Sequence, residues 1–268
     1  MEWLGHTTEK DPVLESHLVD LLGDLSQVPY NSIAGWYRWY HGSDNSVGFP
    51  FGQDCVGKLE FLINELSNRQ LNPDVYFLKS NSVVAGMESP VAHFIALVGG
   101  FIIDPFAHQL FPIHLSDLVE EGYIATQGVV QTRGFCAEYN DNGAFSTSML
   151  QIINPFLPRR LITNTYYPQE LLERLPTPQE YVRFNVPFEY NVILDEVSPY
   201  RLRIERKGNQ SSVKIIFNSK NRLDTEEEVE QSLIETYRID FNSLIDYFQN
   251  GEAIHKYILY WLQHSHSI

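Results

Sequence analysis

Apolar residues recur every three or four positions in two segments of the N-terminal part of the chain. The first segment covers residues 12–27 and ends where the stretch 28-VPYNS-32 brings in a proline. The second segment begins at Cys55 and ends at Asn72-Pro73. This spacing places the apolar side chains on one face of an α-helix. The pattern therefore predicts two amphipathic helices, each with one buried face.

Segments dense in branched and aromatic residues follow the second helix, and this composition is typical of strands. The predicted strands cover residues 74–79, 91–98 and 101–106, and a later β region covers residues 181–194 and 200–217, with a hairpin turn at KGNQ. Short helices are expected to begin at Thr225 and to cover residues 241–248 and 254–262. Residues 145–180 are rich in proline and show no clear period.

The predicted elements divide the chain into three parts. A helical part covers residues 1–73, a β part covers residues 74–180, and a C-terminal β and helical region covers residues 181–268. Neither an internal repeat nor a low-complexity linker separates the parts, which indicates that they share one folded body.

Composition and charge restrict the class of partner. Hydrophobic residues make up 43% of the chain and charged residues 20%, which is ordinary for a globular protein. The formal net charge is -15, which argues against nucleic acid or an anionic membrane as the main partner. Two cysteines give no disulfide framework, and the sequence shows neither a secretory signal nor a membrane-spanning apolar run. We therefore expect a cytoplasmic protein whose thiols stay reduced.

Cys55 lies where the second predicted helix begins. Asp54 is a plausible N-cap, which would place the thiol of Cys55 in the first turn of the helix. Unpaired backbone N–H groups and the positive end of the helix dipole favour a thiolate there. The alternative is that Cys55 is a small buried residue of the core.

His93 and Asp104 lie on two predicted strands joined by Gly99-Gly100, a two-residue hairpin turn. Counting outward from this turn places the two side chains on one face as diagonal neighbours, about 7 to 8 Å apart. Both residues interrupt apolar strands, and a buried carboxylate needs a partner. The pair is either catalytic or a structural hydrogen bond that fixes the hairpin.

Together Cys55, His93 and Asp104 form the set that nucleophilic acyl chemistry requires. An imidazole removes the thiol proton, and a carboxylate selects the imidazole tautomer and stabilises the imidazolium. At these residues the sequence resembles the arylamine N-acetyltransferases and, more distantly, the transglutaminase-like core with its papain-like arrangement. The resemblance implies a Cys at the start of a helix, a His on a strand and an Asp on the next strand.

Further stretches resemble the acetyltransferases loosely: 28-VPYNSIAG-35, 93-HFIALV-98 and 223-LDTEEEVEQSLIETYRIDF-241. Two stretches depart from that family. The nucleophile lies in 51-FGQDCVGKL-59 and the aspartate in 104-DPFAH-108, and both are closer to transglutaminase-like cores. The resemblance therefore implies an acyl-cysteine mechanism more firmly than it implies acetyl-CoA as donor.

Several other residues are weaker candidates. Gln53 could supply an oxyanion-hole donor, and Tyr30 and Phe106 are candidate substrate contacts. Tyr30 belongs to an aromatic cluster with residues 36–40, interpreted either as the lining of an acyl or aryl pocket or as buried core. Cys136, in 133-RGFCAEYN-140, has no His strand after it and is expected to lie outside the site. No zinc site is predicted from the histidines.

We therefore expect an α+β, papain-like cysteine-enzyme fold in which the Cys55 helix packs on an antiparallel β part. The expected function is that of a thiol-dependent acyltransferase that forms an acyl-Cys55 thioester and passes the acyl group to an amine. The donor would be an acyl thioester, such as acetyl-CoA or a carrier-protein thioester, and the acceptor a small-molecule or peptide amine. No bound cofactor is expected. Two alternatives stay open: a cysteine peptidase, amidase or transglutaminase-like enzyme with the same triad, and a non-catalytic binding module.

Overall fold

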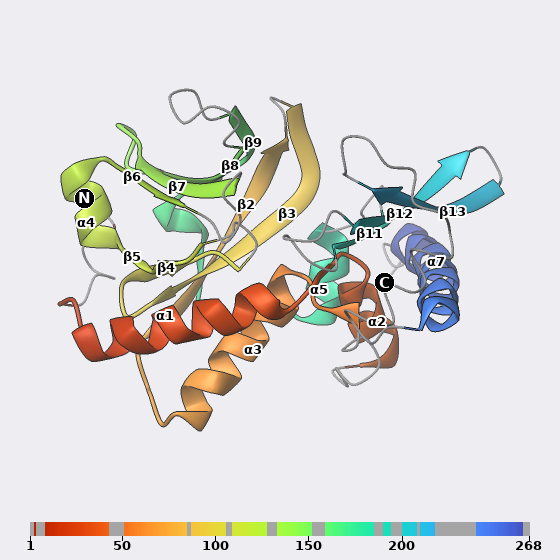
Figure 1. Cartoon of the computed structure of the whole chain (residues 1–268), viewed down its shortest axis with the longest axis horizontal. Helices are drawn as coiled ribbons and strands as arrows, with labels where there is room; N and C mark the ends of the chain where they lie inside the picture. Colours follow the sequence, from red (N-terminus) through yellow and green to blue (C-terminus); the bar gives the residue numbers. More distant parts are fainter. Residues whose placement is uncertain are drawn as a thin grey trace. The chain divides into compact units, whose positions relative to one another are not determined.

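The computed structural model describes residue 3 and residues 9–42, 51–84, 87–105, 109–127, 133–151, 159–184, 190–193, 200–207, 210–217 and 240–264. It is an α+β structure with antiparallel sheets, which confirms the fold class predicted from the sequence at that level (Figure 1). The chain forms two compact units. The first unit contains Met1–Gln27 and Cys55–Leu175, and the second contains Val28–Asp54 and Pro176–Ile268. The papain-like detail and the three-part division stay predictions.

Two helices of the first unit confirm the helical periodicity of the sequence. Helix α1 covers Pro12–Gln27 and helix α3 covers Cys55–Asn68. They pack against each other, and α3 also packs on strand β3 (Figure 1). Their apolar stripes are buried: Leu18, Leu21, Leu22 and Leu25 in α1, and Leu59, Leu62 and Leu66 in α3.

The first unit is built on an antiparallel sheet with the strand order β5-β4-β3-β2-β9-β8-β7-β6, and β10 also pairs with β2. The strands are β2 (Val75–Val84), β3 (Met87–Val98), β4 (Phe101–Ile103), β5 (Ile113–His114), β6 (Tyr123–Gln127), β7 (Arg133–Tyr139), β8 (Phe145–Gln151), β9 (Arg159–Tyr166) and β10 (Leu171–Leu172). A short helix, α4 (Leu115–Glu121), follows β5, and a 3-10 turn, Pro168–Glu170, precedes β10.

The hairpin between β3 and β4 has the register that the sequence predicts. Val98 pairs with Phe101 and Leu97 pairs with Ile102. Gly99 and Gly100 have φ angles of 54° and 84°, in the left-handed region that a two-residue primed turn requires. A side chain at Gly100 would also collide with His114, because its Cβ would lie 2.6 Å from the imidazole Nε2. The turn therefore fixes how β3 and β4 align.

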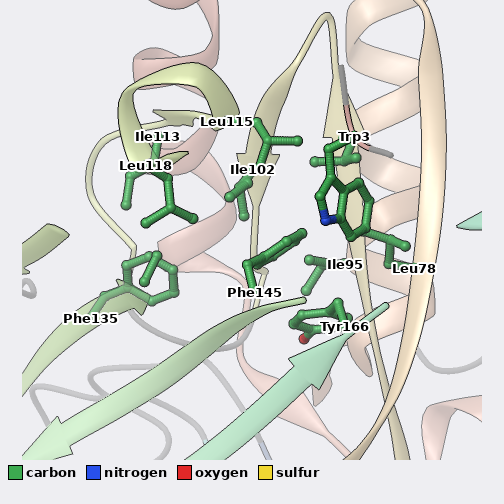
Figure 2. Packing of buried hydrophobic residues seen from close by; sticks show 12 residues of the cluster. Trp3, Leu78, Ile95, Ile102, Ile113, Leu115, Leu118, Phe135, Phe145 and Tyr166 are labelled. Atoms are coloured by element: carbon green, nitrogen blue, oxygen red, sulfur yellow. The ribbon is translucent and has the colours of Figure 1, made fainter. Parts of the chain in front are cut away.

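The core of the first unit lies inside a curled sheet. Figure 2 shows Phe135, Phe145 and Tyr166, from β7, β8 and β9, facing Ile95 and Ile102, from β3 and β4. Strands β3 and β7 are not neighbours, so the sheet must curve for their side chains to share one cluster. Trp3 closes the cluster, and its indole Nε1 donates to the Gly143 carbonyl at 2.6 Å.

In the part of the chain that the structure describes, the second unit combines a four-stranded sheet with three helices. Its strand order is β1-β11-β12-β13, with β1 at Tyr30–Asn31, β11 at Tyr190–Ile193, β12 at Tyr200–Lys207 and β13 at Gln210–Phe217. The β12–β13 pairing confirms the predicted hairpin at KGNQ. Its helices are α2 (Ala34–His41), α5 (Pro178–Phe184) and α7 (Phe241–His264), and α2 packs against the other two. In the described part of the chain, no helix has both the length and the apolar character needed to cross a membrane.

Two predictions for the C-terminal region are wrong. Residues 181–184 are helical rather than extended, because Thr177 and Glu180 form a reciprocal capping box that begins α5. Helix α7 is continuous where two short helices were predicted. Gly251, in its middle, lies where a Cβ would come within 3.3 Å of Ile33, so the glycine allows close packing instead of ending the helix. The helix predicted from Thr225 lies outside the described residues.

Candidate active site

The interior of the curled sheet has a buried polar layer beside its apolar core. Residues two positions apart on a strand point to the same face of the sheet. On five segments, an apolar core residue and a polar residue are spaced in this way. The pairs are Leu78 and Ser80, Ile95 and His93, Ile102 and Asp104, Phe145 and Thr147, and Tyr166 and Asn164. All ten side chains are buried. We call Ser80, His93, Asp104, Thr147 and Asn164 the polar layer.

His93 and Asp104 are hydrogen-bonded within the polar layer. The imidazole Nε2 of His93 donates to the carboxylate Oδ1 of Asp104 at 2.8 Å. The two side chains are 7% and 0% exposed, so the bond is shielded from water. The pairing agrees with the face and the neighbourhood predicted from the β3–β4 register.

Two further residues hold Asp104 in place. The hydroxyl of Thr147, on β8, donates to Asp104 Oδ2 at 2.9 Å. The amide oxygen of Gln109 accepts from the Asp104 backbone N–H at 2.7 Å, and its Nε2 donates to the carbonyls of Ile102 and Phe111. Both carboxylate oxygens therefore have a donor, and the backbone after β4 is pinned. A carboxylate held in this way can orient an imidazole with little freedom to rotate.

Cys55 is the first residue of α3, and its side chain is close enough to act on the imidazole of His93. Burial by itself lowers the pKa of His93, but the charge and hydrogen bond of Asp104, with the added contribution of Cys55, raise it from 6.5 to about 10. The surroundings of His93 therefore favour an imidazolium next to the sulfur. The structure brings all three predicted side chains together.

Cys136 has a different environment. It lies on β7 and is 1% exposed, and burial raises the pKa of its thiol, although a hydrogen bond with Tyr123 opposes the shift. A buried thiol of this kind is a poor nucleophile.

We expect iodoacetamide near pH 7 to alkylate Cys55 before Cys136, because only Cys55 has an imidazole partner among the described residues. Peptide mass mapping after timed labelling of the folded protein measures both rates. Faster modification of Cys136 would overturn the assignment of the nucleophile. Labelling in denaturant, where the two thiols should react alike, is the control for the reagent.

The weaker candidates are placed in the second unit or outside the described residues. The backbone of Gln53 bonds to β1 and to the residue before it, accepting from the Asn31 N–H at 3.0 Å and donating to the Pro29 carbonyl at 2.9 Å. Its side-chain oxygen accepts from Arg38 at 3.2 Å. Tyr30 lies on β1 and pairs with Ile193 of β11. Phe106 lies outside the described residues. Roles for these three residues stay predictions.

Arg38 is a residue that sequence reasoning missed. Its guanidinium Nη2 donates to both carboxylate oxygens of Asp54, at 2.7 and 2.8 Å, and both side chains are buried. A buried bidentate pair is geometrically demanding, so it fixes the residue that immediately precedes Cys55 in the chain. Sequence reasoning predicted only a capping role for Asp54, since nothing local links it to an arginine sixteen positions earlier.

Over the described ranges, no group of three or more His, Cys, Asp or Glu side chains is arranged to hold a metal ion. Thr147 and Gln109 were also missed by sequence reasoning, because neither belongs to a local motif. They are recruited by the strand pairing that brings β8 and the segment after β4 to Asp104.

Comparisons with known proteins give a likeness at the level of structure. No model of a protein family matches the chain, and no curated protein matches its sequence. Among solved structures, the arylamine N-acetyltransferase (NAT) from Salmonella typhimurium aligns with 81% of this chain and 81% of its own, at 11% identity and a TM-score of 0.43.

Proposed function

We propose that the protein is a thiol-dependent acyltransferase in which Cys55 is the nucleophile, His93 the general base and acid, and Asp104 the residue that orients His93. One observation carries the proposal: His93 bonds to Asp104 through Nε2 at 2.8 Å, and the Cys55 side chain also acts on its imidazole. In this arrangement the imidazole can take the thiol proton, and the carboxylate holds the imidazole in the required tautomer. The sequence resemblance to arylamine N-acetyltransferases adds support.

The reaction would proceed in two half-reactions. In the first, the Cys55 thiolate attacks the carbonyl carbon of an acyl thioester, a new C–S bond forms, and the donor thiolate leaves with a proton from the His93 imidazolium. In the second, an amine attacks the acyl-Cys55 carbonyl while His93 accepts its proton, and the Cys55 thiolate leaves. Backbone N–H groups in the first turn of α3 are suitable donors for the oxyanion formed in each step.

This chemistry specifies the chemical classes of the two substrates. The donor would be an acyl thioester, either acetyl-CoA or a carrier-protein thioester, and the acceptor a small-molecule or peptide amine. We propose a papain-like arrangement for the site and a cytoplasmic location, where the thiol stays reduced. The same three residues could also hydrolyse the intermediate, and the outcome depends on whether water or an amine reaches the thioester first.

The fate of the acyl group separates transfer from hydrolysis. We expect acyl-Cys55, once trapped and freed of excess donor, to decay slowly in buffer and much faster after addition of an accepting amine. The measurement is intact mass against time, with arylamines, amino acids and polyamines added separately. Fast decay in buffer that no amine accelerates would contradict the transferase and favour a peptidase or amidase. Failure of every donor to form an adduct would favour a binding module.

A further inference from the structure

Lys58 is a buried cation one helical turn after Cys55. The two residues are three positions apart on α3, so their side chains share one face of the helix. Lys58 is 6% exposed, although lysine is almost never buried without a partner. Its Nζ donates to the carbonyl of Leu25 at 3.3 Å. This carbonyl is among the last four of α1. These carbonyls have no N–H donor within the helix, and they carry the negative end of its dipole.

The charged groups around Lys58 belong to the candidate active site. Cys55 on its own helix and Asp104 after β4 both act on it electrostatically, and His93 of β3 lies between these two residues. In the thiolate form of Cys55 that the reaction requires, two negative groups would stand against the His93 imidazolium and the Lys58 ammonium, and the buried charges would cancel. Without Lys58 the same cluster would carry one net negative charge in a site that excludes water, and that charge would oppose ionisation of the thiol.

We propose that Lys58 supports the candidate active site electrostatically: its ammonium stabilises the Cys55 thiolate and so keeps the nucleophile reactive. This inference rests on the proposed role of Cys55 as the nucleophile. It adds Lys58 to Cys55, His93 and Asp104 as a fourth residue of the site. Lys58 does not touch the reacting atoms in this account. It acts through the electrostatic field along one face of α3.

The environment of Lys58 indicates that its charge is retained at a cost to folding. Burial lowers its pKa from 10.5 to about 8, although the negative charges of Cys55 and Asp104 oppose the shift. The ammonium is therefore less favourable in the folded protein than in the unfolded chain. A residue kept for stability alone would not be expected to carry this penalty, whereas a residue kept for its charge would.

The obvious alternative is that Lys58 only caps the end of α1 through its bond to Leu25. Three variants separate the two roles. Lys58→Gln removes the charge but keeps an N–H donor for the carbonyl, Lys58→Arg keeps the charge, and Lys58→Met removes both. Lys256→Met is the matched control, because Lys256 is an exposed lysine whose side chain is 66% accessible and pairs with Glu252.

The test is the rate of Cys55 alkylation by iodoacetamide as a function of pH, mapped by peptide mass, together with thermal unfolding. We expect Lys58→Gln and Lys58→Met to move the alkylation profile to higher pH and to slow labelling about tenfold at pH 7 or below, since an opposite charge nearby favours a thiolate by this order. Lys58→Arg and Lys256→Met should label close to the wild-type rate. Wild-type labelling of Cys55 that is no faster than that of Cys136 would refute the proposed nucleophile itself.

The unfolding data give the second readout. Because the folded-state pKa of Lys58 lies below its ordinary value, the unfolded chain binds the extra proton between about pH 8 and 10.5, and stability contributed by this group rises with pH across that window. Lys58→Gln should therefore be at least as stable as the wild type at pH 7, and its advantage should shrink as the pH rises toward 10.5. A Lys58→Gln protein that is less stable and labels at the wild-type rate would overturn the inference and leave Lys58 as a structural cap.

Discussion

Cys55→Ser is expected to reduce acyl transfer to background, a loss on the order of 10⁶-fold for removal of the nucleophile from a triad that acts as a unit. The serine hydroxyl is of similar size, so the buried start of α3 should stay intact. A hydroxyl is not ionised by the neighbouring His93 as a thiol is, and the thioester intermediate cannot form.

The measurement is steady-state turnover with the donor and amine found for the wild type. Cys136→Ala is the control, because Cys136 lies on β7 with Tyr123 as its partner and has no proposed part in the reaction. Near-normal turnover by Cys55→Ser, or equal loss in both variants at unchanged thermal stability, would show that the reaction does not pass through Cys55.

Asp104→Asn is the variant with the next largest expected effect. The amide keeps the size of the side chain, but it cannot stabilise the imidazolium of His93 or hold the required tautomer. The same change in a Ser-His-Asp triad costs about 10,000-fold in kcat. We expect a loss of that order in turnover, with KM for the donor nearly unchanged.

The bonds around Asp104 explain why the variant should still fold. The Gln109 oxygen accepts from the Asp104 backbone N–H, which the substitution leaves in place, and the Thr147 hydroxyl can turn to suit an amide. Asp246→Asn, at an exposed position of α7, is the control for removal of one negative charge. Turnover within about tenfold of the wild type in Asp104→Asn would mean that the His93–Asp104 bond only stabilises the β3–β4 hairpin and has no part in catalysis.

Sequence reasoning succeeded where a local pattern determines the structure. The apolar periods of α1 and α3 predict both helices, and Gly99-Gly100 predicts the register that brings His93 near Asp104. These features depend on residues that are close in the sequence. Their geometry follows from helical spacing and turn type without knowledge of distant contacts.

Strands β8 and β9 were missed because polar residues at inward positions interrupt their hydrophobic pattern. Strand β8 has the sequence FSTSMLQ, in which the interior position 147 is a threonine that bonds to Asp104. Strand β9 likewise has a buried polar residue, Asn164, on its interior face. A strand whose inward positions are polar lacks the alternation that predicts a strand, and such conflicts are expected at functional sites.

Contacts that join distant parts of the sequence were also beyond local reasoning. From the sequence, Lys58 would be predicted to be an ordinary surface lysine, because its position on the helix does not reveal that α1 covers it. The capping box at Thr177 was a visible signal that the aromatic and branched residues after it obscured. For Lys58, tertiary packing rather than local composition decides the environment of the side chain.

The central claim is that an acyl group is carried by the sulfur of Cys55. The most direct test is to incubate the wild-type protein with a panel of acyl thioesters, to measure its intact mass and to map the modified peptide. We expect an adduct of one acyl group on Cys55, removable by hydroxylamine as a thioester should be and lost in Cys55→Ser. An adduct on Cys136 or on a lysine, or no adduct with any donor while an amine is still acylated, would contradict it.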